Sequence, residues 1–329
     1  MTYAQLALPG LLFDPADDWV YADDWNTEDT VETFQHATVM RDELVAAVLS
    51  GDRQGGIIVD ATLGGAGHAE AILENDPEVR LIGIDRDADA RNAARARLER
   101  FGDRVTIVSA AFSELAAVLS KLGIDRVRAV CADLGVSSPQ LDRADRGMSF
   151  RHDGPLDMRM DREHGETALE LIERLEDDEL ADVIFKFGDE RRSRRIARSI
   201  KKAAAEGDLR TTLDLRRAVV RAVGPVRVGG LDPATRTFQA LRIAVNGELA
   251  ELDALLMALP SVLEDGGIAS IISFHSLEDR AVKQTFVRND AWSPLHKKPL
   301  TPSDEECVLN SRARSAKLRS ARYVGAAEE

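Results

Sequence analysis

The sequence predicts a doubly wound α/β fold, with a mostly parallel, Rossmann-like sheet and an all-helical insertion. The first observation is that short apolar runs alternate with helical patterns from residue 57 onward. These runs lack the polar alternation of a half-exposed strand, as expected for a parallel sheet that helices cover on both faces. The second observation is that this alternation stops after residue 141, and only helical patterns and loops follow until about residue 236. We therefore expect one α/β domain interrupted by helices.

The elements of the α/β domain follow one another in short units. Each predicted strand is an apolar run, and each predicted helix has apolar residues at helical spacing. We expect strands at 57–64, 80–87, 105–112 and 127–135, with helices at 68–75, 88–101 and 113–123 between them. After the insertion we expect a long helix at 235–263, a strand at 266–275, a helix at 276–287 and two closing strands at 296–300 and 317–324.

The insertion is predicted to contain helices at 177–188, 189–207 and 211–223. Each begins at an Asp or Thr that can cap it, and the first two end at Gly. At 100° per residue the second helix gathers its basic residues within an arc of about 120°, opposite Ile196, Ile200 and Ala203. This basic face is either simply solvated or a phosphate-binding ridge, and its residues are Arg191, Arg194, Arg195, Arg198, Lys201 and Lys202.

The formal charge of −14 is spread unevenly along the chain. The first 40 residues contain eight Asp and Glu and no Lys or Arg, which is typical of an acidic extension outside the folded core. The net charge therefore does not exclude a nucleic acid partner.

No apolar run approaches the ~20 residues of a membrane span, and no signal-like pattern is present, so we expect a cytoplasmic protein without a membrane partner. Cys131 and Cys307 have neither disulfide nor zinc spacing, and we predict no metal.

Functional residues are expected where the parallel strands end, because ligands of such sheets bind outside the carboxyl ends of the strands. Asp60 ends the first strand and precedes a Gly-rich turn, after which His68 opens a helix. Glycine allows close approach of a ligand, and a helix start offers free N–H donors. Asp85 ends the second strand, where a carboxylate can accept hydrogen bonds from ribose hydroxyls. Together these residues predict a site for a nucleoside-containing cofactor.

Two classes of cofactor fit this pattern. A dinucleotide fingerprint would read Gly65-x-Gly67-x-x-Glu70, with Glu where tight packing requires Gly or Ala, and this disfavours NAD. An S-adenosylmethionine site needs the same turn and acidic residue, together with polar groups after the third and fourth strands. Phe112 could lie against the adenine, and Asp133 would stand where cofactor and acceptor meet. The residues therefore favour S-adenosylmethionine.

The segment "DLGVSSPQL" follows the fourth strand directly. Its strand is apolar because it is central and buried, and it ends in polar residues because its tip forms the floor of the site. Ser137 and Ser138 either cap the next helix or contact substrate. His68 and His275 lie at strand ends and are candidate bases, although a histidine that satisfies local backbone groups is as good an explanation.

Long stretches of the sequence resemble the MraW, or RsmH, family of methyltransferases. The similarity extends from about residue 36 to 325, and its most specific blocks are 133–161 and 270–283. The other similar blocks are 36–45, 60–73, 82–87, 188–200, 233–249 and 310–319. The resemblance implies transfer of a methyl group from S-adenosylmethionine to the exocyclic N4 of a cytidine in 16S ribosomal RNA, within the small ribosomal subunit, and a possible homodimer.

The resemblance also implies a class I methyltransferase domain over 36–141 and 237–329, with a helical insertion over 142–236 that we expect to bind RNA. It says nothing about the acidic extension over 1–35, which has no counterpart in the family. Ala66 replaces a residue that is usually Gly, and its methyl group fits without strain if φ is negative. The cofactor contacts implied by the resemblance are Ala66, Gly67, His68, Asp85, Phe112, Asp133 and Gln140.

Methylation of an amine requires alignment and hydrogen-bond acceptors rather than a strong base. Asp133 is therefore the candidate for orienting the target amine, and we assign no general base. Arg159 and Arg162, in the loop after the fourth strand, and the basic stretch at 312–322 are further candidates for RNA contact. Three alternatives stay open: a methyltransferase of this fold acting on another nucleic acid or small molecule, a non-catalytic RNA module in ribosome assembly, and an NAD oxidoreductase.

Overall fold

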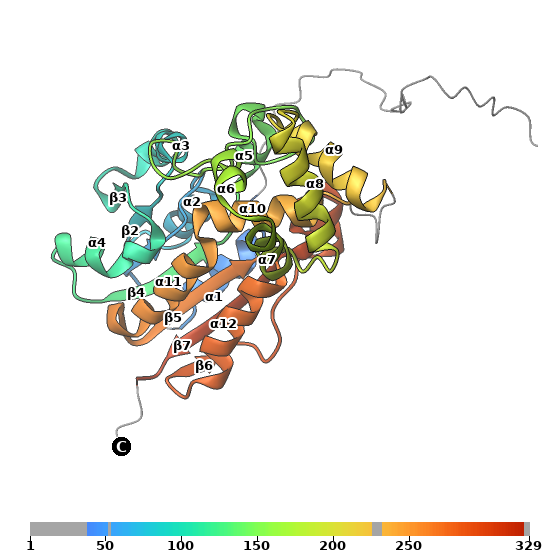
Figure 1. Ribbon diagram of the computed structural model, residues 1–329. Helices are drawn as coiled ribbons and strands as arrows, with labels where there is room; N and C mark the ends of the chain where they lie inside the picture. The colour runs from blue at the N-terminus through green and yellow to red at the C-terminus, as the bar shows by residue number, and fades with distance from the viewer. Residues whose placement is uncertain (1–37, 52–53, 226–231, 326–329) are drawn as a thin grey trace, which may run out of the picture. The chain divides into compact units, whose positions relative to one another are not determined.

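A computed structural model describes residues 38–51, 54–225 and 232–325 (Figure 1). The acidic extension predicted for residues 1–35 lies outside the described residues. Within the described part of the chain, no helix is long and apolar enough to cross a membrane.

One seven-stranded sheet organises the described residues, with strand order β3-β2-β1-β4-β5-β7-β6. The first five strands are parallel, and β7 lies antiparallel between β5 and β6. The Rossmann-like, mostly parallel fold predicted from the sequence is therefore confirmed. The strands are β1 (Gly56–Asp60), β2 (Val79–Ile84), β3 (Val105–Val108), β4 (Val127–Asp133), β5 (Leu263–Ser273), β6 (Trp292–Pro294) and β7 (Lys317–Tyr323).

Helices cover both faces of this sheet, which explains why its strands are apolar throughout. Successive residues of a strand point to opposite faces: Ile58 packs in one hydrophobic cluster with α1, α2 and α3, whereas Val59 packs in another with α4, α11 and α12. These helices are α1 (Arg41–Val48), α2 (Gly67–Asn75), α3 (Ala88–Leu98), α4 (Leu115–Lys121), α11 (Glu248–Val262) and α12 (Ser276–Arg288).

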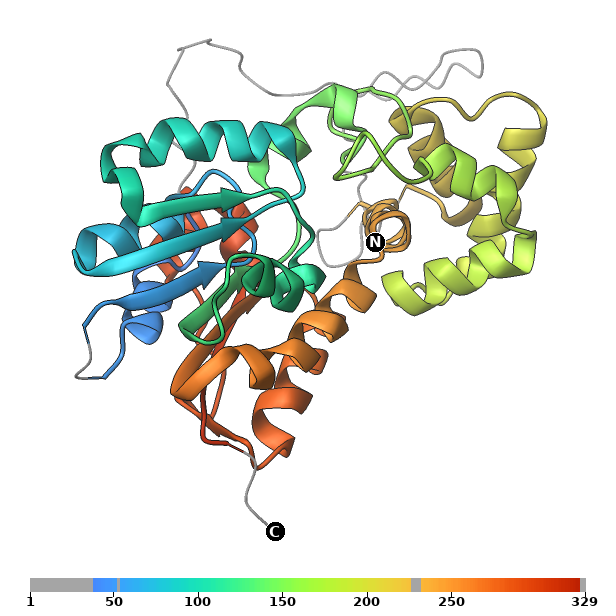
Figure 2. The ribbon, with the colours of Figure 1, turned by 90° about the vertical axis from the view of Figure 1, so that its left-hand side faces the viewer.

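The segment between β4 and α11 builds a third hydrophobic cluster of its own, around Ile184, Ile196, Leu215 and Phe238. Figure 2 shows its helices gathered beside the sheet, and α10 packs against α7, so this cluster continues past residue 236. The helices are α5 (Ser138–Asp142), α6 (Ala168–Arg174), α7 (Asp177–Gly188), α8 (Ser193–Ala205), α9 (Thr212–Val223) and α10 (Thr235–Asn246).

The structure corrects two of the predicted elements. The single helix expected over 235–263 is two helices, because Gly247 adopts φ +61° and ends α10 in the left-handed conformation. The strand expected at 296–300 is wrong: β6 comes earlier, and Leu300 forms only an isolated bridge to Leu318. Pro299 lacks the N–H that a continued strand would need. The other closing strand, β7, is confirmed.

Helix α7 packs tightly against α10 at Gly188. A Cβ atom there would lie 2.5 Å from the backbone oxygen of Arg236. We expect Gly188→Ala to lower the free energy of unfolding by about 1–3 kcal/mol through overpacking, although Ala is the better helix former by about 1 kcal/mol. Denaturant unfolding measures this change. Gly65→Ala is the matched control, because a Cβ atom at Gly65 meets nothing within 4 Å. Equal stability of the two variants would contradict the close approach.

Candidate functional site

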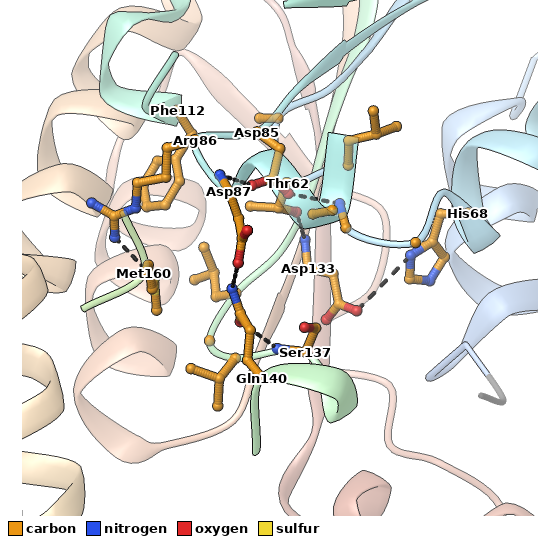
Figure 3. Close-up of a pocket in the computed structure, with 18 of the residues that line it drawn as sticks. Thr62, His68, Asp85, Arg86, Asp87, Phe112, Asp133, Ser137, Gln140 and Met160 are labelled. Carbon is orange, nitrogen blue, oxygen red and sulfur yellow. Dashed lines mark hydrogen bonds and ion pairs between the residues drawn. The ribbon is translucent and has the colours of Figure 1, made fainter. Parts of the chain in front are cut away.

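A cavity of about 280 Å³ lies at the carboxyl ends of the parallel strands (Figure 3). The strand order reverses between β1 and β4, and such a switch point is where ligands bind in open α/β sheets. The structure brings six of the seven predicted cofactor residues into its lining. These are Gly67, His68, Asp85, Phe112, Asp133 and Gln140. Ser137 also lines the cavity.

Ala66 is the predicted contact that does not line the cavity. It is buried, and it precedes α2 with φ +61° and ψ +27°. The condition of a negative φ is therefore not met, and Ala66 adopts the left-handed conformation that glycine tolerates best. Its neighbour Gly67 is required for a different reason: a Cβ atom there would lie 1.8 Å from Oγ1 of Thr38.

The backbone of the Gly-rich turn is tied to the second strand through Asp85. The N–H groups of Gly64 and Asp87 each donate to one oxygen of the Asp85 carboxylate, both at 2.8 Å. Each carboxylate oxygen has a second lone pair, so Asp85 can still accept from a ligand hydroxyl. The predicted ribose position is thus held at the cavity wall by the turn itself.

Gln140 connects the fourth strand to the second. Its Nε2 donates to Oδ2 of Asp87 at 2.7 Å, and its Oε1 accepts from the N–H of Ser137 at 3.0 Å. Asp87 also forms an ion pair with Arg146, whose side chain is only 2% exposed (2.9 Å). Sequence reasoning missed Asp87 and Arg146, because no local pattern signals a contact between residues 59 apart.

Three carboxyl groups converge where β1, β2 and β4 end. Burial, together with the nearby Asp85 charge, raises the pKa of Asp60 to about 7, against the opposing hydrogen bond from the N–H of Thr62. Burial likewise raises the pKa of Asp85. Shielding from water and the charges of Asp60 and Glu278 hold the pKa of Asp133 well above its ordinary value. A cation in the cavity would relieve this repulsion.

Asp133, like Asp85, faces the cavity, whereas Asp60 does not line it. The side chain of Asp133 is 27% exposed, and its Oδ2 lies 4.0 Å from Nδ1 of His68 (Figure 3). The other ring nitrogen of His68 lies 2.9 Å from the carbonyl oxygen of Val39. Among the described residues, Oδ1 of Asp133 is buried without a hydrogen-bond partner. A ligand can therefore reach this carboxyl through the exposed part of the side chain rather than through Oδ1.

A second charged network lines the far side of the cavity. The guanidinium of Arg242 donates to both oxygens of Glu248, each at 2.8 Å. Despite burial, the neighbouring His275 and the N–H of Phe274 lower the pKa of Glu278. Glu248, His275 and Glu278 approach one another closely enough to bind a metal, but Arg242 and the backbone donors already occupy their carboxylates. His275 itself caps α12 by accepting from the N–H of Glu278.

The loop after β4 is fixed by internal contacts. Arg159 pairs with both oxygens of Asp157, and Arg162 pairs with Asp145. Arg146 also donates to the carbonyl of Met160 at 2.8 Å. Arg159 is therefore committed to shaping this loop, and it is a weaker candidate for RNA contact than the sequence predicted.

The basic residues predicted for one helical face differ in their surroundings. Arg191 precedes α8, whereas Arg195 and Arg198 are exposed on it. Arg194 and Lys202 form exposed ion pairs with Asp178 and Glu206.

The side chain of Lys201 is directed toward α6 rather than toward solvent. Its Nζ donates to the carbonyls of Ile172, Glu173 and Leu175, which end α6. Lys201 is therefore a weaker candidate for phosphate contact than the exposed arginines of α8, for a reason that the sequence did not reveal because α6 was not foreseen.

The buried Asp60 makes stability depend on pH. Its folded pKa of about 7 lies above the ordinary 3.8, so folding favours the protonated form and stability is lost as the pH rises between these values. Each pKa unit is worth about 1.4 kcal/mol, which gives an effect on the order of 4 kcal/mol. Asp60→Asn cannot ionise, and its stability relative to the wild type should rise between pH 4 and 7. Urea unfolding across this range measures the difference; parallel pH curves would contradict it.

Comparisons with known proteins show the family to which the chain belongs. The model of the MraW methylase family matches residues 33–324. The ribosomal RNA small subunit methyltransferase H of Sorangium cellulosum is 61% identical over 89% of this chain and 92% of its own length. The protein of the same name from Prochlorococcus marinus is 52% identical over 88% and 94%. A solved ribosomal RNA methylase from Streptococcus thermophilus is 10% identical, covers 86% and 93% of the two chains, and has a TM-score of 0.40. The chain belongs to the MraW methylase family.

Proposed function

We propose that this protein transfers a methyl group from S-adenosylmethionine to the exocyclic N4 of a cytidine in 16S ribosomal RNA, within the small ribosomal subunit in the cytoplasm. The observation that carries the proposal is the convergence of Asp60, Asp85 and Asp133 beside a Gly-rich turn at the switch point of the sheet. Relatives up to 61% identical carry a name that specifies small-subunit ribosomal RNA. Membership of a methylase family removes the NAD oxidoreductase alternative.

The residues of the cavity fit this cofactor. Asp85 can accept from the ribose hydroxyls, and Phe112 offers an apolar surface for the adenine. The start of α2 offers N–H donors to the carboxylate of the methionine part. When bound, S-adenosylmethionine supplies a methyl group on a positively charged sulfur, and the carboxyls around the cavity favour that charge.

Asp133 is placed to orient the amine of the cytidine that receives the methyl group. Its partly exposed carboxyl group can accept a hydrogen from the target amine, which turns the nitrogen lone pair toward the methyl group. In that position the nitrogen would take the methyl group from the sulfonium sulfur as the carbon–sulfur bond breaks, and it would release a proton to water or to a nearby oxygen. Alignment of this kind supplies much of the barrier reduction in a displacement.

The exposed face of α8 is the proposed RNA-binding surface. Arg195 and Arg198 are exposed there, and no ion pair engages them within the described residues. A basic face of this kind neutralises RNA phosphates and makes the affinity depend on salt.

The first expected outcome concerns the reaction itself. Small-subunit RNA from cells that lack this gene should gain labelled N4-methylcytidine when incubated with the protein and labelled S-adenosylmethionine. RNA from cells that carry the gene should gain none. Asp133→Asn should lower the rate by at least about 100-fold, with RNA binding retained. Mass spectrometry of nucleosides measures the product.

Other results of that experiment would support different functions. Detection of a labelled methylated nucleoside other than N4-methylcytidine would show that the protein methylates a different acceptor. Ribosome assembly that depends on the protein but survives Asp133→Asn without methylation would favour the non-catalytic module.

A second expected outcome separates binding residues from structural ones. Arg195→Ala combined with Arg198→Ala should reduce the slope of log affinity against log salt by about 1–2, without a change in stability. Lys201→Met should instead lower the free energy of unfolding by about 1–3 kcal/mol, because the carbonyls at the end of α6 lose a charged donor. Filter binding at several salt concentrations and urea unfolding measure the two effects. An altered salt slope for Lys201→Met alone would contradict the assignment.

A further inference from the structure

Helix α13 (Asp304–Leu309) presents two adjacent aliphatic side chains to solvent. Val308 is 79% exposed and Leu309 is 81% exposed. Exposed large apolar residues that stand alone are common, but adjacent pairs beside a functional cavity indicate an interaction site.

This apolar pair stands at the rim of the cavity. Asn310 follows Leu309 directly, and both Asn310 and Arg312 line the cavity. Consecutive Cα atoms are about 3.8 Å apart. Val308 and Leu309 therefore lie close to the neighbours of any nucleotide that enters the cavity.

Contacts at both ends fix the position of α13. Oε1 of Glu306 accepts from the N–H of Met40 at 2.7 Å, which ties the helix to the start of α1. After the helix, Arg312 pairs with Asp142 on α5. The pair Val308 and Leu309 is therefore held on a supported element rather than on a free loop.

The size and position of this surface favour RNA over protein as the occupant. Two aliphatic side chains offer far less than the ~800 Å² that each partner buries in a stable protein interface. The charges around the pair have both signs, because Asp304, Glu305 and Glu306 form the first turn of α13 whereas Arg312 and Arg314 follow the helix. The pair itself is uncharged, and it lies next to the residues over which a strand would pass when its target nucleotide enters the cavity.

A nucleotide that enters the cavity leaves a gap in the stack of its neighbours. Proteins that unstack bases commonly insert Leu, Ile or similar side chains at such a step. We propose that Val308 and Leu309 form an apolar wedge that packs against the RNA bases flanking the target cytidine. This proposal rests on the proposed function, since it needs a nucleotide in the cavity.

The test compares Val308→Ser/Leu309→Ser with the wild type in the full chain. Met257→Ser is the matched control, because Met257 is 82% exposed on α11 and does not line the cavity. The first readout is the methylation rate on methyl-deficient small-subunit RNA, used either naked or assembled, according to which form the wild type methylates. The second readout is the affinity for S-adenosylmethionine. The double variant should lose about 10-fold or more in rate, because it loses the burial of two aliphatic side chains, with cofactor affinity and unfolding midpoint unchanged.

An RNA strand with 2-aminopurine beside the target cytidine gives a second readout. Its fluorescence should rise when wild type or Met257→Ser binds, and this rise should be smaller with the double variant. Unchanged rate and fluorescence in the double variant would overturn the wedge. A wild-type dimer that the double variant dissolves, or a rate that increases on substitution, would assign the surface to a second copy or to another part of this chain, and would also overturn it. Absence of N4-methylcytidine with the wild type itself would instead overturn the proposed function.

Discussion

The burial of three carboxyls at the ends of β1, β2 and β4 is the constraint on which the site depends. Asp60 lies on the strand between the other two, and burial raises its pKa to about 7, with a smaller contribution from the charge of Asp85. A positively charged ligand in the cavity would favour the ionised forms of these carboxyls, so its binding and their ionisation are coupled. The Gly-rich turn, the backbone donors to Asp85 and the apolar sheet beneath all serve to keep these groups in place.

Much of the fold and part of the site could be predicted from the sequence, for a clear physical reason. Strands buried on both faces are apolar throughout, so they are visible as short runs, and their polar ends mark the cavity. Asp85 and Asp133 were found in this way. Arg146 was not, because its partner Asp87 is distant in sequence and a buried arginine resembles an exposed one in a sequence.

The basic helix shows where periodicity alone reaches its limit. The angle per residue correctly placed Ile196 and Ile200 on the buried face. It could not show that Lys201, at the edge of the opposite face, donates hydrogen bonds to the carbonyls at the end of α6. That short helix lacks a strong sequence pattern of its own. Lys201 therefore combines the position of a surface residue with the role of a helix cap.

The ion pair between Asp87 and Arg146 links two parts of the molecule with different tasks. Asp87 stands beside the proposed ribose position, whereas Arg146 belongs to the loop that leads into the helices α6–α9. Free energy is a function of state, so any coupling through this contact is reciprocal. If a nucleoside in the cavity shifts the affinity of the helices for a polymer by some factor, the polymer must shift the affinity for the nucleoside by that same factor.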